Sequence, residues 1–134
     1  ICGDGGLRSR IYDLGSKMLE DRFQLIKVPY EDMSKIYRVA DIFTLPSESY
    51  YSFEIVLVEA MASGLPVIAN DDPIRREIVG DAGILVDPTN INEYAKVIKK
   101  ALGTNWGERP REQAKKFDWD DIANRYEELI SSFV

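Results

Sequence analysis

Residues 46–66, PSESYYSFEIVLVEAMASGLP, decide the fold of this chain. The stretch begins with a proline and a polar run, continues through an apolar helical segment at residues 53–63, and closes on Gly64, Leu65 and Pro66. Glycine adopts the left-handed conformation that often ends a helix, and proline cannot continue one. The stretch therefore predicts that one strand ends before residue 46, a helix follows, and a new strand starts at Pro66.

Outward from this stretch, short apolar runs alternate with longer segments of helical periodicity. The alternation is typical of the α/β class, with a parallel sheet that carries helices on both faces. The predicted strands are residues 1–2, 23–28, 41–45, 66–69 and 83–86. The predicted helices are residues 6–19, 33–40, 53–63, 74–79, 91–102, 109–116 and 119–133.

Length and composition limit the possible functions. With 134 residues, 45% of them hydrophobic, the chain suits one domain. Its formal net charge of -6 disfavours nucleic acid as a partner. Histidine is absent, which excludes Ser-His and Cys-His nucleophile pairs. No apolar run reaches the roughly 18 residues of a membrane span, and the lone Cys2 suits a reducing compartment, so the cytoplasm is the expected location.

A glycine-rich turn, Gly3-Asp4-Gly5-Gly6, lies between a predicted strand and a predicted helix. The amides and the dipole at a helix start can attract an anion or a nucleotide. Glycines also serve tight turns that need positive φ values, without any ligand. Both interpretations stay open on the sequence alone.

Within the helix predicted at residues 53–63, the apolar run 55–62 contains one acid, Glu59. An ionised carboxylate in such surroundings is costly unless something binds it, and a ribose diol could bind it with two side-by-side hydrogen bonds. A solvent-facing or structurally paired Glu59 is the alternative. Near Phe53 and Glu54, the free amides of the helix start are expected to face a diphosphate.

Taken together, these motifs resemble the family 4 glycosyltransferases. The resemblance rests on residues 53–64 and extends, in the same order, over nearly the whole chain. The other matching segments are residues 3–5, 36–43, 46–47, 77–88 and 117–123.

The resemblance implies a GT-B fold, in which two Rossmann-like domains face each other across a cleft. The N-terminal domain takes the acceptor and the C-terminal domain takes a UDP-, GDP- or ADP-sugar. This chain resembles the C-terminal domain only, without its first strand and helix, so we expect residues 1–134 to be a single donor-binding domain and a fragment that is inactive alone. Any membrane contact is expected through the missing domain, which would make the parent protein peripheral at the membrane.

Residue roles follow from the resemblance position by position. Glu59 would bind the ribose hydroxyls, and the amides of Ile55 and Val56 would approach the diphosphate. Val28 would contact the base, with Met33 covering it. Gly3 and Gly5 match the glycine-rich turn of the family. The implied reaction is a retaining transfer in which the donor phosphate helps to take the acceptor proton, so neither a metal nor a cofactor is expected and no catalytic side chain is assigned.

Two departures from the family pattern keep alternatives open. Tyr51 replaces the first Glu of the paired-Glu motif, which grips the sugar, and Glu48 or Glu54 would have to substitute for it. Glu54 replaces a glycine and places negative charge beside the diphosphate unless its side chain turns away. A degenerate module that binds nucleotide or a protein partner without transfer is therefore the alternative. A GT-B epimerase ranks third, because such enzymes usually rely on a histidine.

The last predicted helix carries an apolar stripe at spacings of three and four residues. We expect this stripe to pack against the domain core rather than to meet a membrane or partner. Its members are Phe117, Trp119, Ile122, Tyr126, Leu129 and Ile130.

Overall fold

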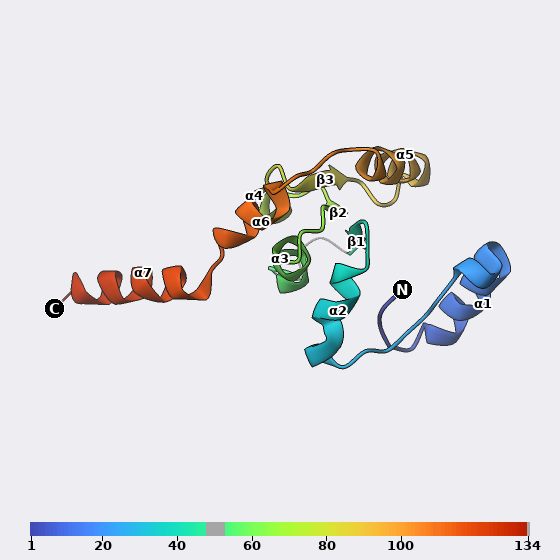
Figure 1. Cartoon of the computed structure of the whole chain (residues 1–134), viewed down its shortest axis with the longest axis horizontal. Coiled ribbons are helices and arrows are strands. Elements are labelled where there is room, and N and C mark those ends of the chain that lie inside the picture. Colours follow the sequence, from blue (N-terminus) through green and yellow to red (C-terminus); the bar gives the residue numbers. More distant parts are fainter. Residues whose placement is uncertain (48–52, 134) are drawn as a thin grey trace. The chain divides into compact units, whose positions relative to one another are not determined.

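The computed structural model describes residues 1–47 and 53–133 (Figure 1). The contacts between residues gather in two compact units, Ile1–Met33 and Ser34–Val134. Each unit is described by itself.

The first unit contains helix α1 (Arg8–Leu19) and two short 3-10 helices, η1 (Glu20–Arg22) and η2 (Tyr30–Asp32). Its two predicted strands meet at one parallel bridge between Cys2 and Ile26. The amide of Gly3 donates to the carbonyl of Ile26, and the amide of Ile26 donates to the carbonyl of Ile1, both at 2.9 Å. The strands predicted at residues 1–2 and 23–28 are therefore reduced to this single bridge.

The second unit is built on a parallel sheet in the order β1-β2-β3 (Phe43–Leu45, Val67–Asn70, Gly83–Val86). Val67 is aligned with Phe43 on one side and with Gly83 on the other. All four residues of β2 are buried, which accounts for its continuous apolar run. The parallel sheet predicted from the alternating pattern is therefore present.

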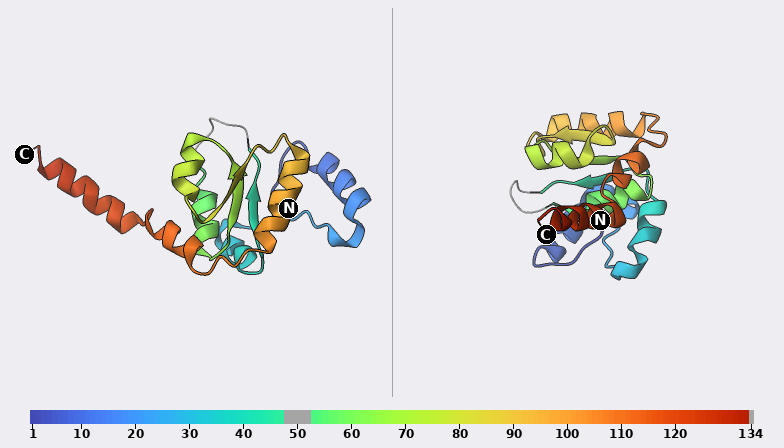
Figure 2. Two further views of the ribbon diagram at one scale, coloured as in Figure 1. Left: turned by 90° about the horizontal axis from the view of Figure 1, so that it is seen from above. Right: turned by 90° about the vertical axis from the view of Figure 1, so that its left-hand side faces the viewer.

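Six helices accompany this sheet in the described part of the chain. Figure 2 shows α3 and α4 on one side of the sheet and α5 on the other. Helix α6 packs against α3. The helices are α2 (Met33–Arg38), α3 (Ile55–Ala62), α4 (Pro73–Val79), α5 (Ile91–Leu102), α6 (Arg109–Lys115) and α7 (Trp119–Ser131).

The alternation of β2 divides the core between the two faces. Ile68 packs with Val97 and Ala101 of α5 on one face. Its neighbour Val67 points to the opposite face, where a Cβ added at Gly83 would meet the side chains of Val67 and Val79. The two faces are therefore closed by different helices, as a doubly wound sheet requires.

The packing predicted for the last helix is wrong for four of the six stripe residues. Helix α7 contains no buried residue, and Trp119, Tyr126, Leu129 and Ile130 are between 54% and 70% exposed. Helical periodicity shows that a stripe exists, but it does not show whether another element covers it. The other two, Phe117 and Ile122, are half-buried, and Phe117 packs against Phe53.

Candidate functional site

The site predicted in the second unit surrounds the start of α3, which follows β1 in the chain. In a parallel α/β sheet, this is the edge at which ligands bind. Two predicted members of the site, Glu48 and Tyr51, lie outside the described residues. The site is therefore built from residues up to Ser47 and from Phe53 onward.

Glu59 lies one turn inside α3 and is half-buried. The hydroxyl of Tyr37, from α2, donates to Oε2 of Glu59 at 3.0 Å. A hydrogen bond to an ionised acceptor contributes about 1.5–3 kcal/mol when it is shielded from water. The carboxylate therefore has a partner within the protein, which answers the question that its apolar surroundings raised.

Tyr37 is well placed to orient this carboxylate. It is only 4% exposed, and its ring meets the ring of Phe43 edge to face, with the centroids 5.6 Å apart. Such aromatic pairs contribute about 0.5–1.5 kcal/mol beyond their burial. A fixed phenol ring gives its hydroxyl a fixed direction, so α2 and β1 together hold one oxygen of Glu59.

Glu54 is the N-cap residue of α3 and adopts the left-handed conformation, with φ 52° and ψ 63°. For a residue other than glycine this conformation costs about 1–2 kcal/mol. The Glu54 side chain does not cap α3. A contact outside the helix must therefore stabilise this conformation of Glu54.

That partner is Arg75 of α4, a fully buried side chain with 1% exposure. Its Nε donates to Oε2 of Glu54 at 2.8 Å, and its Nη2 pairs with Oε1. Nη2 also donates to the hydroxyl of Ser47 at 2.8 Å, and that hydroxyl donates to Oε1 of Glu54 at 2.6 Å. The Glu54 side chain thus turns toward Arg75. In this orientation its negative charge is paired, as it must be if Glu54 is not to repel a diphosphate.

Asp72 completes the surroundings of the guanidinium. Its carboxylate caps α4 by accepting from the amide of Arg75 at 3.0 Å, and it also pairs with Nη1. Burial acts to raise the pKa of Asp72, but the bonds from Arg75 outweigh it and the pKa lies below its ordinary value. The hydrogen bond to Glu54 raises the pKa of Arg75. Asp72 and Arg75 are therefore both charged near neutral pH.

Asn70, the last residue of β2, hydrogen-bonds to both the amide and the carbonyl of Ser47. Its Oδ1 accepts from the amide of Ser47 at 3.0 Å, and its Nδ2 donates to the carbonyl of Ser47. The carboxyl ends of β1 and β2 are therefore joined by a side chain as well as by the sheet. This link fixes where the chain leaves β1.

The other predicted residues of α3 lie at its exposed start. The rings of Phe53 and Phe117 meet edge to face, with the centroids 5.5 Å apart. Phe53 and Ile55 are each 46% exposed, and Val56 is half-buried. The start of α3 therefore lies on a half-exposed surface. Phe53, just before the helix, packs against Phe117 from the C-terminal part of the unit.

In the first unit, Gly3 and Gly5 line a cavity of about 240 Å³ together with Arg8. Arg8 donates to the carbonyl of Gly3 at 2.9 Å. Asp4, between the glycines, binds Lys27 at 2.8 Å, and this bond lowers the pKa of Asp4. The turn is therefore held by side chains of its own unit.

Val28 and Met33 are both half-buried in the first unit. Their predicted contacts with a base stay predictions.

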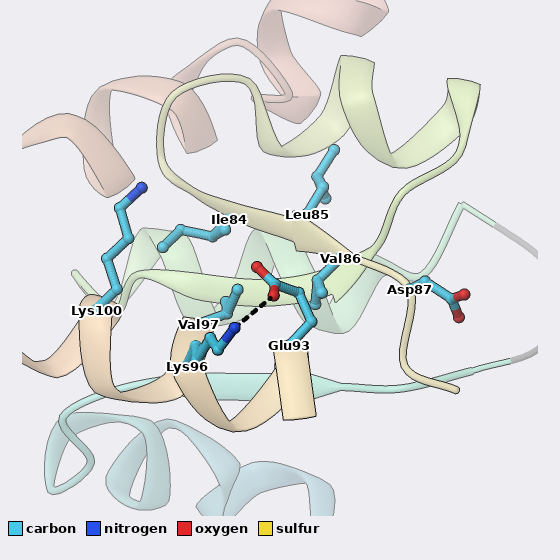
Figure 3. A pocket seen from close by; sticks show the side chains of 8 residues that line it. All are labelled: Ile84, Leu85, Val86, Asp87, Glu93, Lys96, Val97 and Lys100. Carbon is cyan, nitrogen blue, oxygen red and sulfur yellow. Dashed lines mark ion pairs between the residues drawn. The ribbon is translucent and has the colours of Figure 1, made fainter. Parts of the chain in front are cut away.

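A separate cavity of about 380 Å³ lies between β3 and α5 (Figure 3). Glu93 and Lys96 at its rim form an ion pair at 3.6 Å. None of the nucleotide-sugar-binding residues predicted from the sequence lines this cavity. Across residues 1–47 and 53–133, no group of three or more acidic, cysteine or histidine side chains could hold a metal ion.

Four residues that shape the site were not predicted to do so. Tyr37 lies in a segment that matched the family, but its sequence position gave no role. Asp72 before Pro73 is a recognisable N-cap, which places α4 but not its buried arginine. Tyr37, Ser47 and Arg75 were unpredictable because each joins elements far apart in sequence. Asp72, in contrast, binds Arg75 only three residues away.

Comparison with known proteins identifies relatives. The family model for glycosyl transferases group 1 matches residues 1–130. An exopolysaccharide phosphotransferase of Streptomyces coelicolor is 32% identical over 143 residues, covering 100% of this chain and 15% of that protein. O-antigen chain mannosyltransferase B of Escherichia coli is 34% identical over 103 residues, covering 73% of this chain and 27% of that protein. The chain thus spans only a minor part of the length of these relatives.

A solved structure with a similar fold is the pneumococcal O-GlcNAc transferase GtfA in complex with UDP and GlcNAc. The TM-score is 0.74 at 22% identity, over 98% of this chain and 28% of that one. At this identity the likeness shows the fold alone. Within the described residues, no helix combines the length and apolar character that a membrane crossing needs.

Proposed function

The chain belongs to the group 1 glycosyl transferases and has the fold of the C-terminal half of a GT-B enzyme, and on this premise we propose that it binds a nucleotide-sugar donor for retaining glycosyl transfer. The acceptor would be held by an N-terminal domain of the parent protein. The observation that carries the proposal is the carboxylate of Glu59, whose Oε2 accepts a hydrogen bond from the buried Tyr37.

The ribose is the part of the donor that Glu59 would bind. A carboxylate accepts two parallel hydrogen bonds from a vicinal diol, as acidic residues do in dinucleotide-binding folds. Because Tyr37 already fixes the direction of one oxygen, little side-chain freedom would be lost on binding. A ribose would thus meet a carboxylate that is already oriented.

The diphosphate would meet the start of α3. The first amides of a helix lack intrahelical partners and lie at the positive end of its dipole. Helix α3 has no side-chain cap, since its N-cap residue Glu54 is bound to Arg75 instead. The amides of Ile55 and Val56 are therefore the proposed diphosphate ligands.

The degenerate module remains a second candidate because of Tyr51, which replaces the first Glu of the motif. The other departure, Glu54, is weaker support for the degenerate module than the sequence indicated, because both oxygens of Glu54 are bound by Arg75 and Ser47. A module of this kind would bind nucleotide but transfer no sugar.

Calorimetric titration with UDP, GDP and ADP tests the proposal. The solved pneumococcal structure contains UDP, whereas the Escherichia coli relative is named as a mannosyltransferase. The relatives therefore differ in the sugar that they handle, and more than one nucleotide has to be tested. We expect one nucleotide to bind, and the Glu59→Gln variant to bind it at least about sixfold more weakly, which corresponds to about 1 kcal/mol. Glu93→Gln, at the rim of the other cavity, is the matched control and should bind as wild type does.

No binding of any of the three at millimolar concentration would refute donor binding. If one nucleotide binds, sugar transfer by the parent protein separates the two candidates. Transfer supports the glycosyltransferase, whereas nucleotide binding without transfer supports the degenerate module.

A further inference from the structure

The fully buried Arg75 is the strongest feature that the proposed function leaves unexplained. A buried guanidinium is stable only when it is paired and hydrogen-bonded. Arg75 binds three side chains, those of Glu54, Asp72 and Ser47. These come from the start of α3, the start of α4 and the end of β1, so the guanidinium joins three elements at one edge of the sheet.

Glu54 is the informative partner. A glycine would adopt its left-handed backbone at lower cost. Besides accepting a hydrogen bond from Ser47, the side chain binds Arg75 through both carboxylate oxygens, in the planar, two-bond geometry that suits a guanidinium. Without Arg75, this carboxylate would be an unpaired charge beside the first amides of α3.

We propose that Arg75 is a positioning residue for donor binding, which turns the carboxylate of Glu54 away from the start of α3 and neutralises it. The proposal rests on the proposed function, because it assigns the start of α3 to the diphosphate. Arg75 acts through Glu54 and makes no contact with the donor. The pair thus replaces the glycine of the family pattern with two residues that depend on each other.

This dependence predicts the outcome of a double-mutant cycle. Arg75→Met should weaken binding of the preferred nucleoside diphosphate at least tenfold and change binding of the matching nucleoside less than twofold. Glu54→Gly should leave diphosphate binding within threefold of wild type. The double variant should also bind within threefold of wild type, because without Glu54 there is no carboxylate for Arg75 to turn away.

Arg76→Met is the matched control. Arg76 is the next residue of α4, and it pairs with Asp71 at 2.6 Å on the exposed side, with 62% of its side chain accessible. It loses the same charge at nearly the same place in the sequence, and it should bind the diphosphate as wild type does. Far-UV circular dichroism and urea unfolding establish that each variant is folded.

Each result decides the question. Diphosphate binding by Arg75→Met equal to that of Arg76→Met would overturn the role of Arg75. A double variant as weak as Arg75→Met would also overturn it, since Arg75 would then act without Glu54. If Arg75→Met does not fold, the comparison of Glu54→Gly with the double variant is decisive: equal binding supports the proposal, and loss in the double variant overturns it.

The same titrations keep this proposal distinct from the proposed function. A wild-type protein that binds none of UDP, GDP and ADP would refute donor binding, and the role of Arg75 with it. A wild-type protein that binds one of them, together with an unaffected Arg75→Met, would overturn only the role of Arg75.

Discussion

Replacing Tyr37 with phenylalanine tests whether a single hydroxyl organises the proposed ribose site. The change removes the hydrogen bond of 3.0 Å to Oε2 of Glu59 and keeps the ring that packs against Phe43. A hydrogen bond to a charged group contributes about 1.5–3 kcal/mol. Because Glu59 is half-buried and water can replace part of the bond, we expect the free energy of unfolding to fall by about 1–1.5 kcal/mol.

The same change should weaken nucleotide binding. The Glu59 carboxylate remains, but it must now be ordered when the ribose binds, which costs about 0.5–1.5 kcal/mol. This cost corresponds to a rise in Kd of roughly two- to twelvefold. Urea unfolding and calorimetric titration of Tyr37→Phe measure the two effects separately.

Tyr94→Phe is the control for this experiment. The Tyr94 hydroxyl contacts the hydroxyl of Thr44 on the face of the sheet that α5 covers, away from Glu59. It should lower stability without a change in Kd. A Tyr37→Phe protein that loses stability but binds nucleotide with the wild-type Kd would refute the idea that Tyr37 prepares Glu59.

Three further substitutions test the packing and the charges of the second unit. Leu57→Ala, at a residue with 0% exposure, should lower the free energy of unfolding by about 2–5 kcal/mol in urea; a loss below about 1 kcal/mol would contradict its place in the core. Gly83→Ala should cost about 3 kcal/mol or more in thermal unfolding, because the new Cβ would lie 2.1 Å from the carbonyl oxygen of Val67; a wild-type Tm would argue against this β2-β3 register. Asp72→Asn keeps a cap but removes a charge whose pKa is lowered in the folded state. The free energy of unfolding of the wild type should exceed that of this variant by about 1–3 kcal/mol between pH 5 and 7. The difference should shrink as the pH falls below about 4, where Asp72 of the unfolded chain takes up a proton, and it should be lost as the pH falls further through the lowered pKa of the folded state; a difference that does not change with pH would show that the charge has no part in it.

Local signals made most of the second unit predictable. Gly64 and Pro66 mark the end of one helix and the start of the next strand, and β2 begins at Val67 as they indicate. The predicted helix at residues 91–102 is α5, residue for residue, because Asn90 caps its start and Gly103 follows its end. In these places the sequence pattern and the tertiary structure agree.

The site was predictable only in part. Glu59 stood out because a lone acid in an apolar helix requires an explanation, and the structure gives it a partner. The identity of that partner, Tyr37, and the pairing of Glu54 with Arg75 depend on which elements meet in the folded unit. Spacing along the chain carries no information about contacts 21 or 22 residues apart in sequence between separate helices.

The exposure of helix α7 determines how readily its backbone hydrogen bonds open. It has 13 residues, none of them buried, and isolated helices of about 12–15 residues are only marginally stable in water. Its hydrogen bonds would therefore open and close on the microsecond timescale of a helix-coil equilibrium, whereas those of β2 would open only with the whole sheet. Amide hydrogen exchange along Trp119–Ser131 should be close to that of an unstructured peptide, and any slowing of that exchange would measure directly how firmly something covers its apolar side.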